Sequence, residues 1–278
     1  MSGILYIVAT PIGNLGDISP RAAGTLAEVD FIAAEDTRVT LKLLNHLGIK
    51  KPLISYYAHN MAESGDKIAA RLLAGESCAL VTDAGTPAVS DPGEALVRLC
   101  ASAGIEVISV PGPCAAVAAL AASGLGSGRF TFEGFLSTAR RARSERLCEL
   151  KDERRAMIFY EAPHKLLRTL SDMLEALGDR RVSISRELTK IHEETLRCTL
   201  SEAVETFRER APRGEFVLVI EGAPPPEIRG DPSAAQAELE RLSERGMSLR
   251  DAARLAAERF GVSKNALYTA ALKGARKQ

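Results

Sequence analysis

The stretch Thr82–Gly93 reads TDAGTPAVSDPG and lies between two apolar segments. It follows Cys78–Val81, a short apolar run typical of a buried strand, and precedes Glu94–Cys100, which has the apolar spacing of a helix. A connection between a strand and a helix needs only a few residues. Because this one is longer and rich in glycine, proline and small polar residues, it indicates a loop whose backbone approaches a ligand.

Strand-like and helix-like segments alternate on both sides of this loop. Short apolar runs predict strands at Ile4–Ala9, Phe31–Ala34, Cys78–Thr82 and Glu106–Val110. Amphipathic runs predict helices at Pro20–Val29, Arg38–Leu47, Ala62–Leu73 and Pro92–Ala103. This alternation is typical of a mainly parallel sheet that is covered by helices.

A glycine- and serine-rich break at Gly124–Gly128 is followed by a second series of strands and helices. The expected strands are Phe130–Phe132, Ala156–Tyr160, Val182–Ser185 and Phe216–Glu221, and the expected helices are Thr138–Lys151, Pro163–Ala176 and Ser201–Arg210. Three consecutive prolines at 224–226 end this series, and the remainder has a helical pattern. We expect an α/β domain at residues 1–122, a second α/β domain at 123–225 and a helical domain at 231–278.

Composition limits the possible classes of protein. The formal net charge of the 278 residues is zero, so no field of the whole chain attracts nucleic acid. The five cysteines form no CxxC pair and the four histidines are scattered, which disfavours disulfides and a metal site and favours a reducing cytoplasm. The uncharged run Val107–Gly128 is interrupted by prolines and glycines, so we expect no membrane span, and we find no signal peptide.

Four of the predicted strands run into loops that could bind a ligand, at residues 9–19, 35–38, 82–93 and 111–115. Ligands of open α/β sheets bind beyond the carboxyl ends of the strands, where these loops would meet. The chain has no GxxxxGK[ST] string, no GxGxxG string and no GxSxG nucleophile elbow. Loops without a basic phosphate anchor favour a neutral or zwitterionic ligand over a polyphosphate.

Seven motifs, in order, resemble the tetrapyrrole-methylase family. They read IVATPIGNLGDIS, AAEDTR, VTDAGTPAVSDPG, VPGPCA, FYEAPHK, RELTKIHEE and GEFVLVIEG, and the resemblance extends from Ile4 to about Lys273. They are most similar to the branch that methylates the ribose 2′-hydroxyl of a cytidine in 16S rRNA with S-adenosylmethionine. Cys114 and Lys165 are small departures, because many members carry serine and arginine there. The resemblance implies two α/β domains with the cofactor in a cleft between them, and a homodimer.

The resemblance also implies the residues of the cofactor site, by motif position. They are Asp83, Gly85, Thr86, Val89, Ser90, Cys114, Ala115, Tyr160, Glu161, Glu215 and Phe216.

A ribose hydroxyl is a weak nucleophile, so a base or a cation near the reacting oxygen would assist methyl transfer. The candidates for this catalytic role are Asp36, Arg38, Glu187 and Lys190, and His192 lies in the same motif as the last two. Asp36 and Arg38 could instead pair with each other and merely close a loop. Positioning of the hydroxyl could also suffice without a base.

Three segments could contact RNA. The first loop, with Asn14, is a candidate lid over the acceptor, and Arg140, Arg141 and Arg143 form a basic segment that a solvated helix face explains equally well. Residues 248–272 resemble a helix-turn-helix, in which Gly261 ends one helix and Ser263 caps the next. Arg250, Lys264 and Lys273 would face the RNA phosphates, unless these helices pack on the body or on a second subunit.

The sequence therefore favours a methyltransferase that uses S-adenosylmethionine, acts on 16S rRNA or the small ribosomal subunit and works in the cytoplasm. Two alternatives stay open. One is a methyltransferase of the same fold that acts on a tetrapyrrole or another small molecule. The other is a regulator whose α/β body senses a ligand and whose helix-turn-helix binds nucleic acid without turnover.

Overall fold

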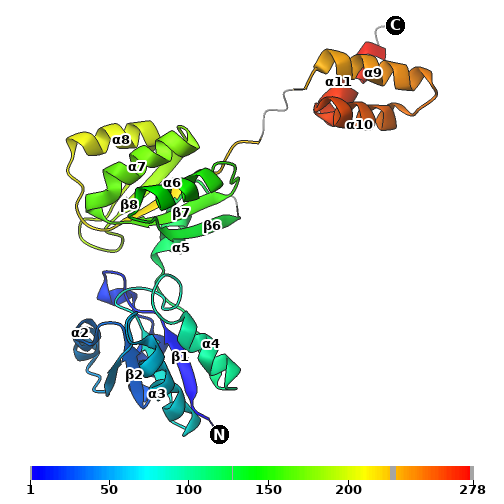
Figure 1. The fold of residues 1–278 in the computed structure, drawn as a ribbon. Coiled ribbons are helices and arrows are strands. Elements are labelled where there is room, and N and C mark those ends of the chain that lie inside the picture. The colour runs from blue at the N-terminus through cyan, green and yellow to red at the C-terminus, as the bar shows by residue number, and fades with distance from the viewer. Residues whose placement is uncertain (1, 127, 226–229, 276–278) are drawn as a thin grey trace. The chain divides into compact units, whose positions relative to one another are not determined.

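The computed structural model describes residues 2–126, 128–225 and 230–275 and divides the chain into two compact units, Met1–Ala223 and Pro224–Gln278 (Figure 1). The first unit contains two five-stranded sheets, and the second contains three helices. The predicted fold class, two α/β sheets followed by a small helical domain, is therefore confirmed.

The first sheet is fully parallel, with the strand order β3-β2-β4-β1-β5. Its strands are β1 (Ile4–Val8), β2 (Phe31–Ala34), β3 (Leu53–Ser55), β4 (Cys78–Val81) and β5 (Glu106–Val110). Its connections contain the 3-10 turn η1 (Leu15–Asp17) and the helices α1 (Pro20–Glu28), α2 (Thr37–Leu47), α3 (Met61–Leu73) and α4 (Glu94–Ser102). The four predicted strands are confirmed, whereas the three-residue β3 was missed because it is too short to show a pattern.

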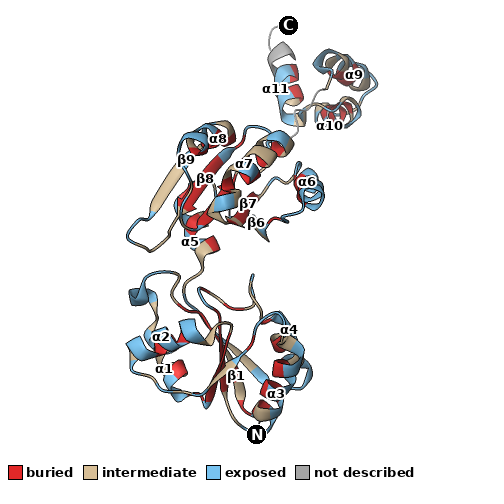
Figure 2. Ribbon diagram, turned by 60° about the vertical axis from the view of Figure 1, so that its left-hand side comes forward, coloured by how far each residue is buried: buried red, intermediate tan, exposed pale blue. Residues whose placement is uncertain are grey.

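Both faces of this sheet are covered, as the unbroken apolar sequences of β2 and β4 require. Alternate strand residues pack on α3 and α4 on one face, around Ile68 and Leu96, and on α1 and α2 on the other face, around Leu26 and Leu44. The strand interiors are buried and the outer helix faces are exposed (Figure 2). The ends of the parallel strands are therefore left to carry the loops that bind a ligand.

The second sheet is mixed, with the order β6-β7-β10-β8-β9; only β6 and β7 are parallel neighbours. Its strands are β6 (Phe130–Phe135), β7 (Ala156–Glu161), β8 (Arg181–Arg186), β9 (Glu194–Thr199) and β10 (Phe216–Ile220). Its helices are α5 (Ala115–Ser123), α6 (Arg140–Glu149), α7 (Pro163–Leu177) and α8 (Leu200–Glu209). The edge strand β9 was missed because its sequence, ETLRCT, is mostly polar and only half buried.

The neighbouring strands β7 and β10 of the second sheet each contribute to two apolar cores. Phe216 and Leu218 face the core with α7 and α8, whereas Val217 and Val219 face α5. The predicted domain boundary at residue 122 falls at the end of α5, a helix that packs on the second sheet. Both sheets belong to one compact unit, so a boundary between them stays a prediction.

The C-terminal unit consists of α9 (Pro232–Glu244), α10 (Leu249–Phe260) and α11 (Lys264–Ala275), which share a core of alanines and leucines. Gly261 ends α10 in the left-handed conformation at φ 60°, and the Ser263 hydroxyl accepts a hydrogen bond from the Ala266 N–H at 3.4 Å. Both predicted caps of the helix-turn-helix segment are therefore confirmed.

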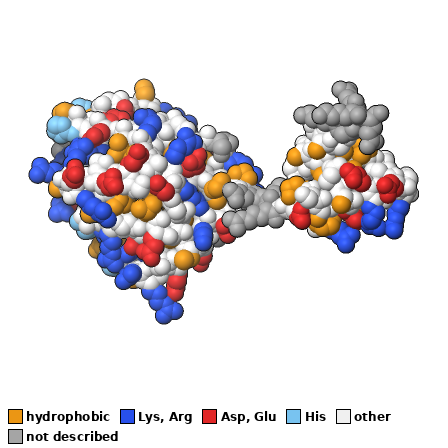
Figure 3. All heavy atoms as spheres, turned by 90° about the horizontal axis from the view of Figure 1, so that it is seen from above, with side chains coloured by type: hydrophobic (Ala, Val, Ile, Leu, Met, Phe, Trp, Pro, Cys, Tyr) orange, Lys and Arg blue, Asp and Glu red, His pale blue; other side chains and the backbone are white. Residues whose placement is uncertain are grey.

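Charged side chains of both signs are interspersed on the face drawn in Figure 3, in keeping with the zero net charge of the chain. Within the described residues, the structure contains no helix that combines the length and the apolar character needed to cross a membrane.

Candidate functional site

A cavity of about 590 Å³, which we call the ligand cavity, lies where loops of the first sheet meet strand ends of the second. Its volume is in the range typical of small-molecule sites. All eleven residues that were predicted to hold the cofactor line it. The loops after β1, β2, β4 and β5 line one side, and the adjacent ends of β7, β8 and β10 line the other. The seven sequence motifs thus converge on one cavity.

The long loop after β4 owes its shape to contacts with two other loops. Gly85, at φ 88°, exchanges two backbone hydrogen bonds with Thr10, at 2.9 and 3.1 Å. The Thr86 hydroxyl donates to the Pro113 carbonyl at 3.0 Å. Ala88 adopts a left-handed φ of 63°, which is uncommon for a residue other than glycine. The loop is long because it joins the first and fourth loops into one wall of the ligand cavity.

Three carboxyl groups lie together on this wall: Glu35, Asp83 and Asp91. The Glu35 carboxylate accepts a hydrogen bond from the Thr82 hydroxyl, and Asp83 Oδ1 accepts one from the Asp36 N–H at 3.1 Å. Loss of water around the group raises the pKa of Asp83 and of Asp91 above the usual 3.8, and the nearby Glu35 charge raises both further. Ionisation of these two aspartates therefore costs free energy in the free protein, and a cationic ligand would offset that cost.

None of the described residues that line this cavity is a lysine or an arginine. Its apolar lining includes Ala115, Leu188 and Val217. No group of three or more histidine, cysteine or acidic residues within the described chain could hold a metal ion. The arrangement therefore suits a ligand with apolar parts and positive charge.

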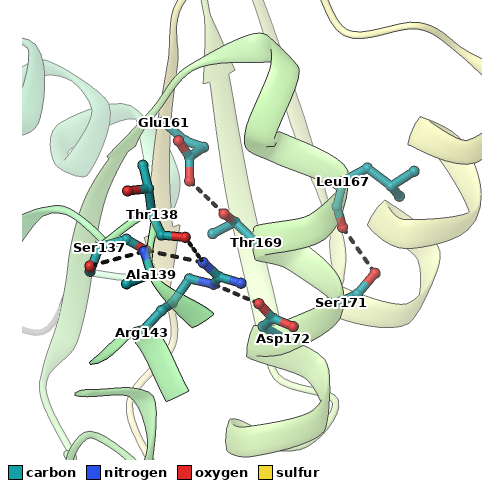
Figure 4. Close-up of polar contacts among 9 residues, drawn as sticks. All are labelled: Ser137, Thr138, Ala139, Arg143, Glu161, Leu167, Thr169, Ser171 and Asp172. Carbon is teal, nitrogen blue, oxygen red and sulfur yellow. Dashed lines mark hydrogen bonds and ion pairs between the residues drawn. The ribbon is translucent and has the colours of Figure 1, made fainter. Parts of the chain in front are cut away.

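Tyr160 and Glu161 form the wall that the second sheet contributes. The Tyr160 hydroxyl accepts a hydrogen bond from the Ala116 N–H at 3.1 Å, and burial raises its pKa to about 12, so it stays protonated. The buried Glu161 carboxylate accepts from the Ala162 N–H at 2.8 Å and from the Thr169 hydroxyl (Figure 4). Glu161 thus holds the start of α7 in place, and Tyr160 holds the start of α5.

Asp36 and Arg38, two of the predicted catalytic residues, do not line the ligand cavity. Asp36 caps α2 and forms an ion pair with Arg38, whose side chain is 87% exposed. The hydrogen bonds from Arg38 lower the pKa of Asp36 to about 2. A carboxylate with so low a pKa is a poor general base at neutral pH, so these contacts favour the alternative in which the pair closes a loop.

Glu187 and Lys190, the other catalytic candidates, are bound to each other at 2.9 Å, and Lys190 also contacts Glu215 at 3.0 Å. Glu187 Oε1 accepts a further hydrogen bond from the Glu215 N–H at 3.0 Å. The Lys190 ammonium lowers the pKa of Glu187, which weakens it as a base. Neither residue lines the ligand cavity, although Glu215 does. Their geometry favours a structural role, in which they hold the loop after β8 against the segment that precedes β10.

The segment that carries Lys190 also touches the first loop. A Cβ atom on Gly13 would lie 2.5 Å from Lys190 Cγ, so the Lys190 side chain packs closely against the backbone of the first loop. The segment has left-handed backbone at Glu187 (φ 51°) and at Thr189 (φ 68°), which is rare for a β-branched residue. The Thr189 hydroxyl is buried and has no hydrogen-bond partner among the described residues. Strained backbone in a closely packed segment is typical of functional sites.

The predicted RNA contacts fall into two groups. Arg143 is 4% exposed, and its guanidinium donates to Asp172 at 2.6 Å and to the carbonyls of Ser137 and Thr138 (Figure 4). We therefore correct the expectation for Arg143, because a buried and paired side chain cannot reach RNA. Arg140 and Arg141, at the start of the same helix, are exposed.

The remaining RNA candidates lie at exposed or half-buried positions. Asn14 caps η1 by accepting a hydrogen bond from the Gly16 N–H at 2.9 Å. Arg250 is exposed and Lys264 half-buried, and neither side chain has a partner among the described residues. The side chain of Lys273 lies outside the described part of the structure.

Several residues of the ligand cavity were missed from sequence: Ile12, Glu35, Asp91, Phe135, His164, Ser185 and Leu188. Glu35 belongs to the motif AAEDTR, in which the prediction names the adjacent Asp36, and Asp91 belongs to TDAGTPAVSDPG, in which it names Asp83 and Ser90. Their position within these motifs was the signal by which both residues could have been predicted to line the cavity. A sequence does not show which of two adjacent carboxylates points into a cavity.

Two family models match the chain. The model of the "Tetrapyrrole (Corrin/Porphyrin) Methylases" matches residues 4–204, and that of the "RsmI C-terminal HTH domain" matches residues 229–275. Together they match the greater part of each compact unit.

Named relatives are similar over nearly their whole length. "Ribosomal RNA small subunit methyltransferase I" of Synechocystis sp. is 50% identical over 275 residues, which cover 97% of this chain and 98% of that protein. The protein of the same name from Escherichia coli O157:H7 is 46% identical over 275 residues, 97% of this chain and 95% of that one.

Solved structures with the same fold are more distant in sequence. Uroporphyrin-III C-methyl transferase from Thermus thermophilus, complexed with S-adenyl homocysteine, has a TM-score of 0.56 at 17% identity and covers 79% of this chain and 97% of its own. Diphthine synthase has a TM-score of 0.59 at 12% identity, with 79% and 90% covered. At such identities the likeness concerns the fold alone.

Proposed function

Since this chain belongs to the tetrapyrrole methylase family, and within it to the ribosomal RNA small subunit methyltransferase I group, we propose that it transfers a methyl group from S-adenosylmethionine to the ribose 2′-hydroxyl of a cytidine in 16S rRNA. The single observation that carries the proposal is the ligand cavity, in which residues of all the family motifs meet around an acidic group without a lysine or arginine among its described lining residues.

The residues of the ligand cavity fit S-adenosylmethionine. This cofactor supplies a methyl group activated by a sulfonium cation, and it also carries an ammonium group. Asp83 and Asp91, whose pKa values are raised by lost hydration and by the nearby Glu35 charge, match such positive charge. Ala115, Leu188 and Val217 offer apolar surface, and the wall fixed by Tyr160 gives the cavity a defined shape.

The chain's own residues would act mainly by positioning. Orientation of reacting groups can lower a barrier by roughly 7–11 kcal/mol, so a strong base is not required. Lys190 lies between the first loop and Glu215, a residue of the ligand cavity. We propose that Lys190 and the first loop with Asn14 hold the acceptor ribose, while Glu187 keeps Lys190 and Glu215 in place. Asp36 and Arg38 would support the loop beside Asp83.

Labelled methyl transfer tests the proposal. The full chain is incubated with methyl-labelled S-adenosylmethionine and with 16S rRNA, assembled small subunits or a porphyrin precursor, and the RNA is digested to nucleosides. We expect label in 2′-O-methylcytidine. Label on the base would contradict ribose methylation, label on the porphyrin would favour the small-molecule alternative, and specific DNA binding without any label would favour a regulator.

The affinity for S-adenosylmethionine should depend on pH. A cationic ligand favours the ionised forms of Asp83 and Asp91, whose pKa values lie above the usual 3.8 in the free protein. Binding should therefore weaken as the pH falls towards these raised values, and it should release protons in that range. Calorimetry in buffers of different ionisation enthalpy measures both effects. An affinity that stays constant down to pH 4 would contradict this role of the two aspartates.

The setting of the enzyme is also part of the proposal. All five cysteines are free thiols, which suits the reducing cytoplasm, and the family resemblance suggests a homodimer. Sedimentation velocity of the purified chain would distinguish a dimer of about twice 29.8 kDa from a monomer.

A further inference from the structure

A second cavity, of about 370 Å³, lies beside the ligand cavity and has a different chemical character. We call it the arginine pocket. Its lining residues are Arg186, Phe207, Arg210, Ala211, Pro212, Arg213 and Phe216. Phe216 lines both cavities, so the two share a wall. A group held in the arginine pocket would therefore be a near neighbour of whatever enters the ligand cavity.

The arginine pocket carries an excess of positive charge. Arg210 forms a two-pronged ion pair with Glu194, at 2.8 and 2.7 Å, and Arg186 reaches the same carboxylate at 3.5 Å. Arg213 is exposed and has no partner for its guanidinium among the described residues. Among the described residues, the Glu194 carboxylate pairs with Arg210 and Arg186, and Arg213 adds a third guanidinium to the pocket, so its side chains keep an excess of positive charge.

The backbone around Arg213 is fixed on both sides. Arg186 Nε donates to the Arg213 carbonyl at 2.6 Å, and β8 and β10 pair so that Arg186 lies opposite Phe216. Gly214 follows at φ 85°, and a Cβ atom there would lie 2.5 Å from Glu187 Cγ. The loop therefore presents Arg213 from a rigid support, which reduces the entropy lost when an anion binds.

We infer that the arginine pocket binds a backbone phosphate of the RNA strand whose ribose is methylated. Planar guanidinium groups recognise phosphate through paired hydrogen bonds, and a free arginine beside two half-neutralised ones offers such donors. An RNA strand carries a phosphate on each side of every ribose, so a phosphate beside the ligand cavity would position the strand. This inference rests on the proposed function, because it takes RNA to be the acceptor.

Substitution of Arg213 tests the inference through RNA binding, which is measured without turnover. We expect Arg213→Ala to weaken binding of 16S rRNA by about tenfold, which corresponds to one lost charge-assisted contact. The slope of log affinity against log salt should become shallower by about 0.7–0.9, the value for one phosphate contact. Arg213→Lys should retain the salt slope and part of the affinity, because lysine keeps the positive charge and loses only the paired hydrogen-bond donors of the guanidinium.

Arg208→Ala is the matched control, since Arg208 is exposed in the last turn of α8, two residues before Arg210, and does not line the pocket. It should leave both RNA affinity and salt slope close to those of the unmodified chain. The inference is overturned if Arg213→Ala binds RNA as Arg208→Ala does, whether both variants are unchanged or both are weakened. S-adenosylmethionine affinity should be unchanged in both variants. A failure of the proposed function would appear as missing ribose label in the unmodified chain, whatever Arg213 does.

Discussion

Replacement of Asp83 and Asp91 by asparagine should abolish useful binding of S-adenosylmethionine while leaving the fold intact. A hydrogen bond or contact to a charged group contributes roughly 1.5–3 kcal/mol, so each substitution should weaken binding by about 10- to 100-fold. The double variant should lose methyl transfer at ordinary cofactor concentrations. Calorimetry gives the affinities, and labelled transfer gives the activity.

The same substitutions should not destabilise the free protein. Lost hydration and the nearby Glu35 charge raise the pKa of both carboxyl groups, so replacement by neutral amides of the same shape should not cost stability. We expect a Tm equal to or slightly above that of the unmodified chain. Asp66→Asn, an exposed position on α3 outside the ligand cavity, is the control and should leave both affinity and Tm unchanged. Unchanged affinity in Asp83→Asn and Asp91→Asn would show that the acidic group does not serve the cofactor.

Removal of Arg143 should cost more stability than any other arginine of its segment. Its buried guanidinium pairs with Asp172 and with two backbone carbonyls, as Figure 4 shows. Loss of one partner of a buried ion pair typically costs about 3–5 kcal/mol, because the other charge is left without compensation. We expect Arg143→Ala to lower the free energy of unfolding by about this amount, as measured by urea denaturation.

Arg140→Ala is the matched control for stability, since Arg140 is exposed at the start of the same helix. Its free energy of unfolding should change by less than about 0.5 kcal/mol. If Arg143→Ala instead unfolded like the unmodified chain and bound RNA more weakly, Arg143 would contact RNA and the structural role assigned to it would be wrong.

The sequence predicted the parts of the fold that have strong local patterns. Local patterns alone were sufficient to predict the strands β2, β4 and β10, which are apolar runs, and the helix caps at Gly261 and Ser263. The polar edge strand β9 did not, because an edge strand that packs on one side needs few apolar residues. Arg143 looked like its exposed neighbours because the Asp172 that buries it lies on another helix, 29 residues away.

The ligand cavity was largely predictable because it is assembled from loops that follow strand ends, and the motifs name those loops. The arginine pocket was not predictable, since Arg186 and Arg213 lie 27 residues apart and meet only through the antiparallel pairing of β8 with β10. The local sequence of a strand does not show which strand it pairs with in a mixed sheet. The acid chosen for catalysis, Asp36, is one residue away from the Glu35 that lines the cavity.

The central claim is that the ligand cavity holds S-adenosylmethionine. The most direct measurement is a crystal structure of the full chain grown with saturating S-adenosylmethionine or S-adenosylhomocysteine. We expect electron density for the compound inside the ligand cavity, in contact with Asp83, Ala115 and Tyr160. Density at another site, or an empty cavity in a protein that calorimetry shows to bind the compound, would contradict the claim.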